Sequence, residues 1–338
     1  MAAVGKSTGR RTRLRRVAVA AVVVGVVTAG SLTAGCTGGG KPVDDGRAPE
    51  PKPTPSPTLS GERTASVLAV KVDNAPSARP HTGLDAADII YVEQVEGGLS
   101  RLLAVYASEL PTAVGPVRSA RETDLELLRQ FDRPTLAFSG AQTKLLPLID
   151  RAPLHAEPPG RTPGAYYRAA DQAAPHNLYL RPHHLVPSAP GKAALTTTGF
   201  TYGAAPEGGE PETTRTVRYP AARFTFTWDD SRDRYRVAMD GTAAVTTDGQ
   251  PVAPATVVVQ YVRMRPSGYF DSRGNNSPYT ETVGSGTAQV LRDGKSYEAL
   301  WKRPEPGDGT RFTTVDGEPV NFADGQVWVV LTRAASRD

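Results

Sequence analysis

The stretch that opens the first foldable segment reads Val67-Leu68-Ala69-Val70-Lys71-Val72-Asp73-Asn74. Its apolar part has the length and composition of a β-strand, and polar residues follow at once. Ile89-Ile90-Tyr91-Val92 and Leu102-Leu103-Ala104-Val105-Tyr106 have the same character. Residues 119–131 instead repeat apolar side chains at helical spacing. This mixture predicts an α/β or α+β domain over residues 64–198.

A different pattern follows residues 199–215, which are rich in Gly, Pro and Glu and are expected to form an exposed linker. Strand-like runs such as Phe224-Thr225-Phe226-Thr227-Trp228 alternate there with Asp-Gly pairs. An Asp-Gly pair between two such runs, as at Asp293-Gly294, favours a two-residue hairpin because both turn positions take positive φ. We therefore expect a mainly antiparallel β domain over residues 216–334.

The first 35 residues have the three parts of an export signal in the usual order. A basic region ends at Arg16, an uncharged apolar run follows, and small residues lead to Leu32-Thr33-Ala34-Gly35-Cys36. This order predicts a lipoprotein signal peptide over residues 1–35 and a lipid on Cys36. An uncleaved transmembrane helix over residues 17–35 and plain secretion are the alternatives. The expected location is the extracytoplasmic face of the cell membrane, and the general secretory and twin-arginine export routes both stay open.

The positive charge of the chain belongs to this N-terminal segment. The formal net charge is +4, but six of the 39 basic residues and no acidic residue precede Cys36. The remaining 33 basic residues are matched by 35 acidic ones, so the electrostatic argument for a nucleic-acid partner disappears. Cys36 is also the only cysteine, which excludes an intramolecular disulfide.

Residues 36–63 are Gly-rich and then Pro-rich and contain very few apolar side chains. A segment of this composition cannot bury enough surface to fold, so we expect a disordered tether with a polyproline bias. Such a tether would hold the following domain away from the membrane.

Two polar clusters border the first strands. Asp73 and Asn74 follow the first strand, with Arg79 shortly after, and the rim of a strand is a usual place for a site. The simpler interpretation is a turn in which Asp73 or Asn74 binds its own backbone. Glu93 shares a strand face with Tyr91 and is expected to need a partner such as Arg101. Paired carboxylates can also cleave glycosidic bonds, so Asp73, Glu93 and Glu96 are the acid and base candidates.

A third cluster contains Arg118, Ser119, Arg121 and Glu122. Ser119 and Glu122 have the spacing of a capping box, which predicts that a helix begins there. The unpaired N–H groups of a helix N-terminus, with two arginines beside them, suit a phosphate, carboxylate or sulfate. The alternative is that both arginines pair with carboxylates inside the fold.

His176 follows a proline in the irregular region after residue 150 and could act as an acid or base, or contact a ligand. The other histidines lack metal-ligand spacing, so no metal site is predicted. The sequence also has neither a phosphate-binding P-loop nor a dinucleotide fingerprint, and no cofactor is predicted.

These clusters together resemble the YerB-like lipoproteins, a family defined by a domain of unknown function, DUF3048. The resemblance spans most of residues 66–190 and is looser near Gly284 and Asp293-Gly294. It implies a lipoprotein signal, a spacer, an N-terminal domain and a smaller C-terminal domain, but no activity. The stretches that carry it in the first domain are residues 70–74, 78–84, 87–91, 96–101 and 115–121.

The sequence thus predicts an extracytoplasmic lipoprotein that binds an anionic envelope polymer or an envelope protein, and an enzyme is the less favoured reading. One alternative is an envelope hydrolase that uses first-domain carboxylates and His176, and another is a purely structural interaction module. The membrane is the expected partner of the lipid on Cys36. The proposed ligand groove has the candidate residues Asp73, Asn74, Arg79, Glu93, Arg101, Arg118, Ser119, Arg121 and His176.

Overall fold

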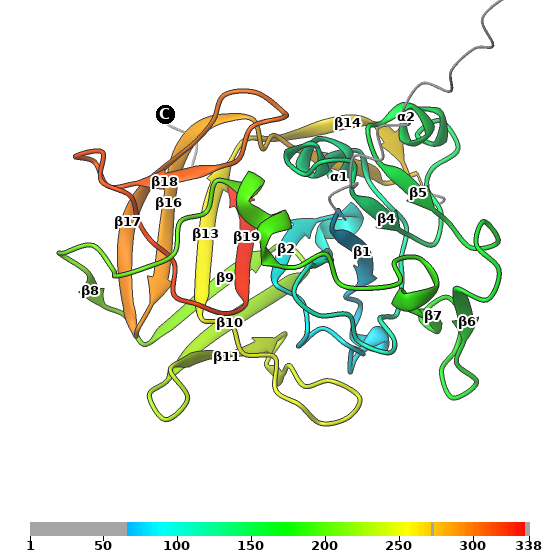
Figure 1. Ribbon diagram of the computed structural model, residues 1–338, viewed down its shortest axis with the longest axis horizontal. Coiled ribbons are helices and arrows are strands. Elements are labelled where there is room, and N and C mark those ends of the chain that lie inside the picture. Colours follow the sequence, from blue (N-terminus) through cyan, green and yellow to red (C-terminus); the bar gives the residue numbers. More distant parts are fainter. Residues whose placement is uncertain (1–65, 272–273, 335–338) are drawn as a thin grey trace, which may run out of the picture. The chain divides into compact units, whose positions relative to one another are not determined.

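The computed structural model describes residues 66–271 and 274–334 (Figure 1). The predicted signal peptide, Cys36 and the predicted tether lie outside the described residues. Strands dominate the described part, and its α-helices are short: α1 is Glu122–Leu127 and α2 is Leu146–Arg151. The few helices and several sheets confirm the predicted fold class for the folded part of the chain.

One sheet of eleven strands contains strands from both halves of the chain. Its order is β18-β17-β16-β13-β19-β2-β3-β1-β4-β5, and β8 pairs with β17 off this path. The first half of the chain contributes β1 (Leu68–Asp73), β2 (Ile89–Gln94), β3 (Ser100–Tyr106), β4 (Thr135–Ala137) and β5 (His155–Glu157). The rest of the chain contributes β8 (Glu210–Pro211), β13 (Thr256–Val262), β16 (Gly284–Arg292), β17 (Lys295–Arg303), β18 (Arg311–Thr313) and β19 (Val327–Arg333).

The two halves meet where β19 pairs in parallel with β2, with Val327 opposite Ile89. Gln326, the residue before β19, supports this junction with its side chain. Its Nε2 donates to the carbonyls of Ala87 at 2.8 Å and Leu84 at 3.0 Å. The two predicted domains, residues 64–198 and 216–334, therefore share one sheet, and their boundaries stay a prediction.

The central strands are mostly apolar, and side chains cover both faces of the sheet. In β1, Ala69 belongs to one core cluster, whereas Leu68 and Val70 belong to the other. Successive side chains of a strand point to opposite faces, so a strand buried on both sides reads as a continuous apolar run. This is why the stretch from Val67 to Val72 is recognisable in the sequence.

A second sheet covers one face of this central sheet (Figure 1). Phe224 and Phe226 lie with their ring centroids 6.2 and 5.7 Å from that of Trp328 in the central sheet. Alternate residues of the second sheet point outward and are more exposed. Its strands are β9 (Thr214–Tyr219), β10 (Ala222–Asp229), β11 (Arg234–Met239) and β12 (Thr242–Ala243).

Two hairpins complete the described strands. One pairs β14 (Met264–Phe270) with β15 (Asn276–Thr280), and it packs on α1, where the Thr280 N–H donates to Thr123 Oγ1 at 3.0 Å. The other pairs β6 (Tyr166–Arg168) with β7 (Leu178–Leu180). The short 3₁₀ helices are η1 (Pro76–Ala78), η2 (Glu96–Gly98), η3 (Leu128–Gln130), η4 (Pro182–His184) and η5 (Lys192–Thr198).

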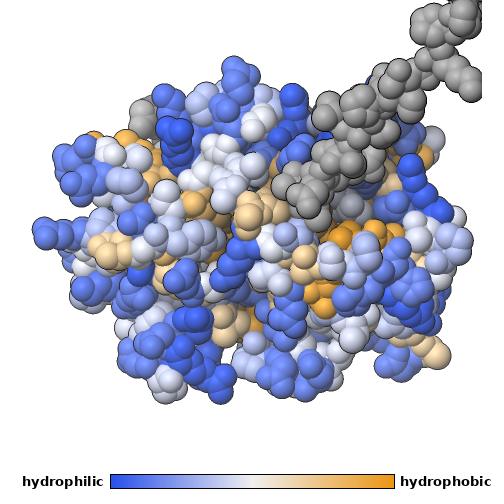
Figure 2. Space-filling model, viewed as in Figure 1, coloured by the Kyte–Doolittle hydropathy of each residue, from blue (hydrophilic) through white to orange (hydrophobic). Residues whose placement is uncertain are grey.

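The Asp293-Gly294 turn connects β16 to β17 as predicted. Asp293 has a φ of 54° and Gly294 a φ of 69°, the two positive values that this tight hairpin needs. Hydrophilic residues dominate the face of the molecule in Figure 2, with smaller apolar areas between them. Such a surface fits a sheet whose apolar side chains are buried on both faces.

Arg303, the last residue of β17, is fully buried and fastens α1 to the second half of the chain. Its guanidinium donates to Thr282 Oγ1 at 3.0 Å and to four carbonyls, those of Glu126, Leu127, Pro306 and Asp308, at 2.9, 3.5, 2.6 and 2.9 Å. Burial lowers the pKa of Arg303. Each of these carbonyls would lose its donor if the side chain were removed.

Arg303→Ala is expected to lower the free energy of unfolding by ~3 kcal/mol or more, because several buried acceptors lose a charged donor. Urea unfolding monitored by tryptophan fluorescence measures this change. Lys302→Ala, at the exposed neighbouring position, should change stability by less than ~0.5 kcal/mol. Equal effects of the two substitutions would contradict the role assigned to Arg303.

His81 is buried between the two halves. Its Nε2 lies 2.8 Å from the carbonyl oxygen of Asp73, and its own carbonyl accepts from the Thr247 N–H at 2.9 Å. In neutral His81, Nε2 therefore carries the hydrogen that Asp73 O accepts. Burial lowers the pKa of His81 from 6.5 to about 4, although the bond to Asp73 opposes this shift.

Acid is expected to destabilise the fold through His81. The unfolded chain binds this proton near pH 6.5 and the folded chain only near pH 4, so stability falls as the pH drops between these values. The loss reaches about 3 kcal/mol at pH 4. Unfolding curves from pH 7.5 to 4 should be flatter for His81→Gln, whereas the exposed His183→Gln should follow the parent protein.

Candidate functional site

The carboxylate of Asp73, at the end of β1, joins two of the predicted site residues. Asp73 Oδ2 lies 2.8 Å from His176 Nδ1 and 3.1 Å from Arg118 Nε. The Arg118 contact has ion-pair distance but not hydrogen-bond alignment, so the buried Nε–H of Arg118 stays without a hydrogen bond. Asp73 Oδ1 also accepts from the Ala75 N–H at 3.2 Å, so the turn interpretation of this residue holds as well.

Backbone pairing explains why residues so distant in sequence meet here. The Arg118 N–H donates to the Lys71 carbonyl at 2.7 Å, which places residue 118 beside β1. The Val117 N–H donates to the Leu178 carbonyl at 2.6 Å, which places β7 and the neighbouring His176 on the other side. The Asp73 side chain is 6% exposed, whereas those of Arg118 and His176 are 26% and 22% exposed. Solvent therefore reaches Arg118 and His176 rather than the carboxylate.

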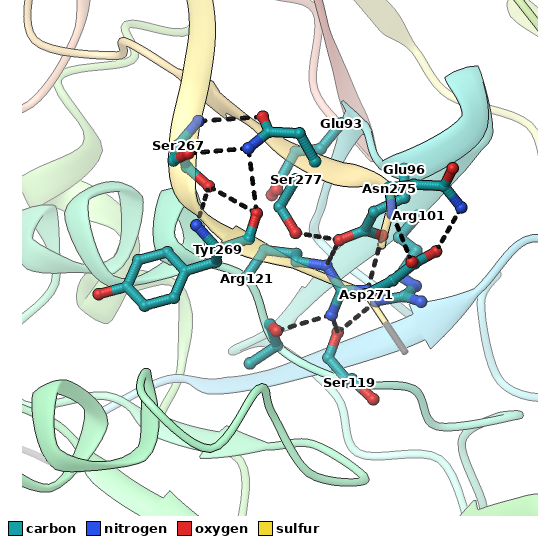
Figure 3. A network of polar contacts seen from close by, with 12 residues as sticks. Glu93, Glu96, Arg101, Ser119, Arg121, Ser267, Tyr269, Asp271, Asn275 and Ser277 are labelled. Carbon is teal, nitrogen blue, oxygen red and sulfur yellow. Dashed lines mark hydrogen bonds and ion pairs between the residues drawn. The ribbon is translucent and has the colours of Figure 1, made fainter. Parts of the chain in front are cut away.

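Arg121 is held by a fork of two hydrogen bonds. Its Nε and Nη2 donate to the two carboxylate oxygens of Glu96 at 2.6 and 2.7 Å. Ser277 of β15 donates to the same carboxylate (Figure 3). Burial raises the pKa of Glu96, but the hydrogen bonds and the charge of Arg121, together with the hydrogen bond from Ser277, hold this pKa below its ordinary value. The alternative in which Arg121 pairs inside the fold is therefore correct.

Arg101 has no carboxylate within ion-pair distance in the part of the chain that the structure describes. Its Nη1 donates to the Ser119 carbonyl at 2.9 Å, and Figure 3 shows it near Arg121. Burial, followed by repulsion from Arg121 and Arg118, lowers the pKa of Arg101 to about 9, against the opposing effect of Glu96. Three guanidinium groups thus lie near one another, and Asp73 and Glu96 pair with two of them.

The predicted partner of Glu93 is wrong. Arg101 is opposite Glu93 on the neighbouring strand, but Glu93 Oε2 instead lies 3.0 Å from Lys71 Nζ. Lys71 also donates to Asp124 Oδ1 at 2.7 Å, and all three side chains are buried. Burial, with repulsion from Asp124, raises the pKa of Glu93 despite the attraction of Lys71. The long side chain of Lys71 reaches both carboxylates, while Arg101 is bound to Ser119.

Lys71 was not identified from the sequence as a polar centre of this region. A signal for Lys71 was available, because it is the one charged residue inside the first apolar run. Its importance depends on β1 being covered on both faces, which a single strand does not reveal.

The predicted capping box at Ser119 and Glu122 is also wrong. Helix α1 begins at Glu122, and the side chain of Asp124 accepts from the Arg121 N–H at 2.6 Å. Ser119 Oγ instead lies 3.4 Å from Ser139 Oγ. The chain before the helix is held extended by the Ala120 N–H, which donates to the Gly140 carbonyl at 3.0 Å, so Ser119 cannot turn toward α1. The helix is one of six residues, and its N-terminus is occupied by Asp124.

Arg79 and Asn74 form a separate group that ties η1 to β11. Arg79 Nε donates to Asn74 Oδ1 at 3.0 Å, and Arg79 Nη1 lies 2.9 Å from Asp240 Oδ2. Asn74 Nδ2 donates to Ser100 Oγ at 2.9 Å. Of the predicted site residues, Asp73, Arg118 and His176 are in direct contact, and Arg101, Ser119 and Arg121 adjoin them. Glu93 belongs to the buried group with Lys71.

The residues that the structure describes contain neither a candidate metal site nor a membrane-spanning helix. Residues 66–271 and 274–334 contain no group of three His, Cys, Asp or Glu side chains that could hold a metal ion. Neither of their short helices has the length and apolar character that crossing a bilayer requires.

Comparisons with known proteins agree on one family. Residues 54–195 match the model of the N-terminal domain of DUF3048, a protein family of unknown function, and residues 215–329 match its C-terminal domain. The Bacillus subtilis protein named "Putative lipoprotein YerB" is 27% identical over 274 residues, which are 78% of this chain and 80% of that protein. The crystal structure of YerB from Bacillus subtilis has the same fold, with a TM-score of 0.65 and 23% identity over 80% of this chain and 91% of that one. The chain therefore belongs to the DUF3048 family of YerB-like proteins.

Proposed function

We propose that this protein is a lipid-anchored, extracytoplasmic receptor for an anionic group of the cell envelope. The proposed binding residues are Arg101, Arg118 and Arg121, with His176 beside them. The observation that carries the proposal is the difference between the three arginines. Asp73 pairs with Arg118 and Glu96 pairs with Arg121, whereas Arg101 has no ion-pair partner among the described residues.

Arg118 offers the most accessible donors of the three. In the described chain its guanidinium makes one polar contact, the ion pair with Asp73 through Nε, so both terminal nitrogens can bind a ligand. Planar guanidinium donors favour phosphate and carboxylate oxygens, which can accept two parallel hydrogen bonds. Two of the donors of Arg121 are already bound to Glu96, so Arg121 would act on the ligand mainly through its charge. An anion at Arg118 would also relieve the repulsion that Arg101 experiences from its neighbours.

Two observations support the anchor. The basic, apolar and small-residue segments before Cys36 have the order of a lipoprotein signal. The Bacillus subtilis relative is itself named as a lipoprotein. Location on the extracytoplasmic face follows if the signal is used for export.

Hydrolysis of an envelope polymer is the second candidate, and the contact between Asp73 and His176 favours it. A carboxylate that accepts from Nδ1 leaves Nε2 of neutral His176 as a base for water. Glu93 would not act directly in this hydrolase, because it is 1% exposed and bound to Lys71.

Cys36→Ser is expected to abolish lipid labelling of the full chain and to release it from membranes. Radiolabelled palmitate and cell fractionation measure the two effects, and Ser31→Ala serves as the matched control. A variant that loses its label but stays in the membrane would support the uncleaved-helix alternative over the lipid anchor.

Arg118→Ala is expected to weaken binding of an anionic polymer to the full chain by at least about tenfold, the effect of ~1.4 kcal/mol from a lost charged hydrogen bond. Poly(glycerol phosphate) and poly-γ-glutamate test the phosphate and the carboxylate, with dextran as the neutral comparison. Binding should weaken as salt increases.

Arg311→Ala removes the same charge from exposed β18, at the opposite end of the central sheet, and should leave binding unchanged. Equal weakening by both substitutions would show a nonspecific charge effect and reject the site. Polymer shortening that His176→Gln abolishes would favour the hydrolase instead.

A further inference from the structure

A cavity of about 340 Å³ lies where β2 and β19 begin. It shares no lining residue with the arginine site. Its wall combines four parts of the chain: Asp88 before β2, Glu109 after β3, Phe200 and Tyr202 between the two family domains, and Gln326 before β19. The cavity therefore exists only when both domains are assembled.

The inner wall of this cavity is apolar, and its side chains pack into the core of the protein. Leu195 and Phe200 are buried in the core, and the ring of Phe200 lies 4.9 Å from that of Phe322. Tyr202 is held by a backbone bridge to Phe322, yet it remains 42% exposed. The cavity thus presents an aromatic ring to solvent above an apolar floor, which suits the hydrocarbon part of a small ligand.

The rim of the cavity is negatively charged. The side chains of Asp85, Glu109 and Asp324 line it and have no hydrogen-bond or ion-pair partner among the described residues. Asp88 is different, because its carboxylate already accepts from the N–H groups of Ala107 and Ser108. Lys192 is the one basic side chain of the lining. Four carboxylates against one ammonium group leave an excess of negative charge.

The pKa of the Tyr202 hydroxyl reflects this negative charge. Burial of this hydroxyl, together with Asp88 and Asp324, raises its pKa to about 12. A cation over the Tyr202 ring gains attraction from the π face as well as from the carboxylates.

We propose that this cavity binds a primary ammonium group on a short alkyl chain. The chain would occupy the floor formed by Leu195 and Phe200, and the ammonium would lie between Tyr202, Asp85 and Asp324. A free diamine and a lysine side chain of a peptide both have this chemistry. Neutral or anionic compounds of the same length lack the charge that the rim attracts.

The test uses the full chain and follows binding by isothermal titration calorimetry and by the fluorescence of Tyr and Trp. Pentane-1,5-diamine represents the free amine and N-acetyl-lysine methylamide represents the peptide side chain. Pentan-1-ol and glutarate are the neutral and anionic comparisons. Saturable binding of either ammonium compound, with at least tenfold weaker binding of the comparisons, is the expected result.

Asp324→Asn should weaken ammonium binding about fivefold, and the double variant Asp85→Asn, Asp324→Asn should weaken it further. These carboxylates are exposed and have no partner, so both variants should fold normally. Glu305→Gln removes the same charge from an exposed loop after β17 and serves as the matched control. Equal binding of pentan-1-ol, unchanged affinity in the double variant, or no saturable binding of either amine would overturn the proposal.

Discussion

The parallel pairing of β19 with β2 is the interaction on which the rest of the structure depends. It makes one sheet from strands that are more than two hundred residues apart in the chain. Gln326 and Trp328 support it from either side, because Trp328 Nε1 donates to Gln326 Oε1 at 2.8 Å and the Gln326 amide donates to the loop before β2. Both core clusters extend across the junction, so neither half could keep its apolar faces covered alone.

The same constraint determines where charge collects. Strands buried on both faces have no room for unpaired polar groups, so Lys71, Glu93 and Asp124 compensate one another in the interior. The two candidate binding regions lie where central strands begin or end. At one strand end Asp73 meets His176 and Arg118, and at the start of β2 and β19 several carboxylates surround a cavity. The molecule thus has one region of excess positive charge and another of excess negative charge.

These two regions differ in how they are built. The arginine site is formed by backbone pairing within the first family domain, through β1, the extended chain before α1, and β7. The cavity is formed by both domains and by the segment between them. A segment rich in Gly, Pro and Glu therefore does more than connect, because Phe200 packs into the core and Tyr202 lines the cavity.

The sequence by itself determined the strand character of the central runs, the antiparallel second half with its Asp-Gly turns, and the family. These features depend on local periodicity and on turn chemistry, which neighbouring residues specify. It also identified Asp73, Arg118 and His176 as candidates, since charged or titratable residues stand out beside apolar strands. Only the tertiary structure decided which side chains meet: Lys71 rather than Arg101 pairs with Glu93, and Asp124 rather than Ser119 occupies the start of α1. Side-chain partners depend on which strands are adjacent and on how far each side chain reaches, and neither quantity is present in the order of residues along the chain.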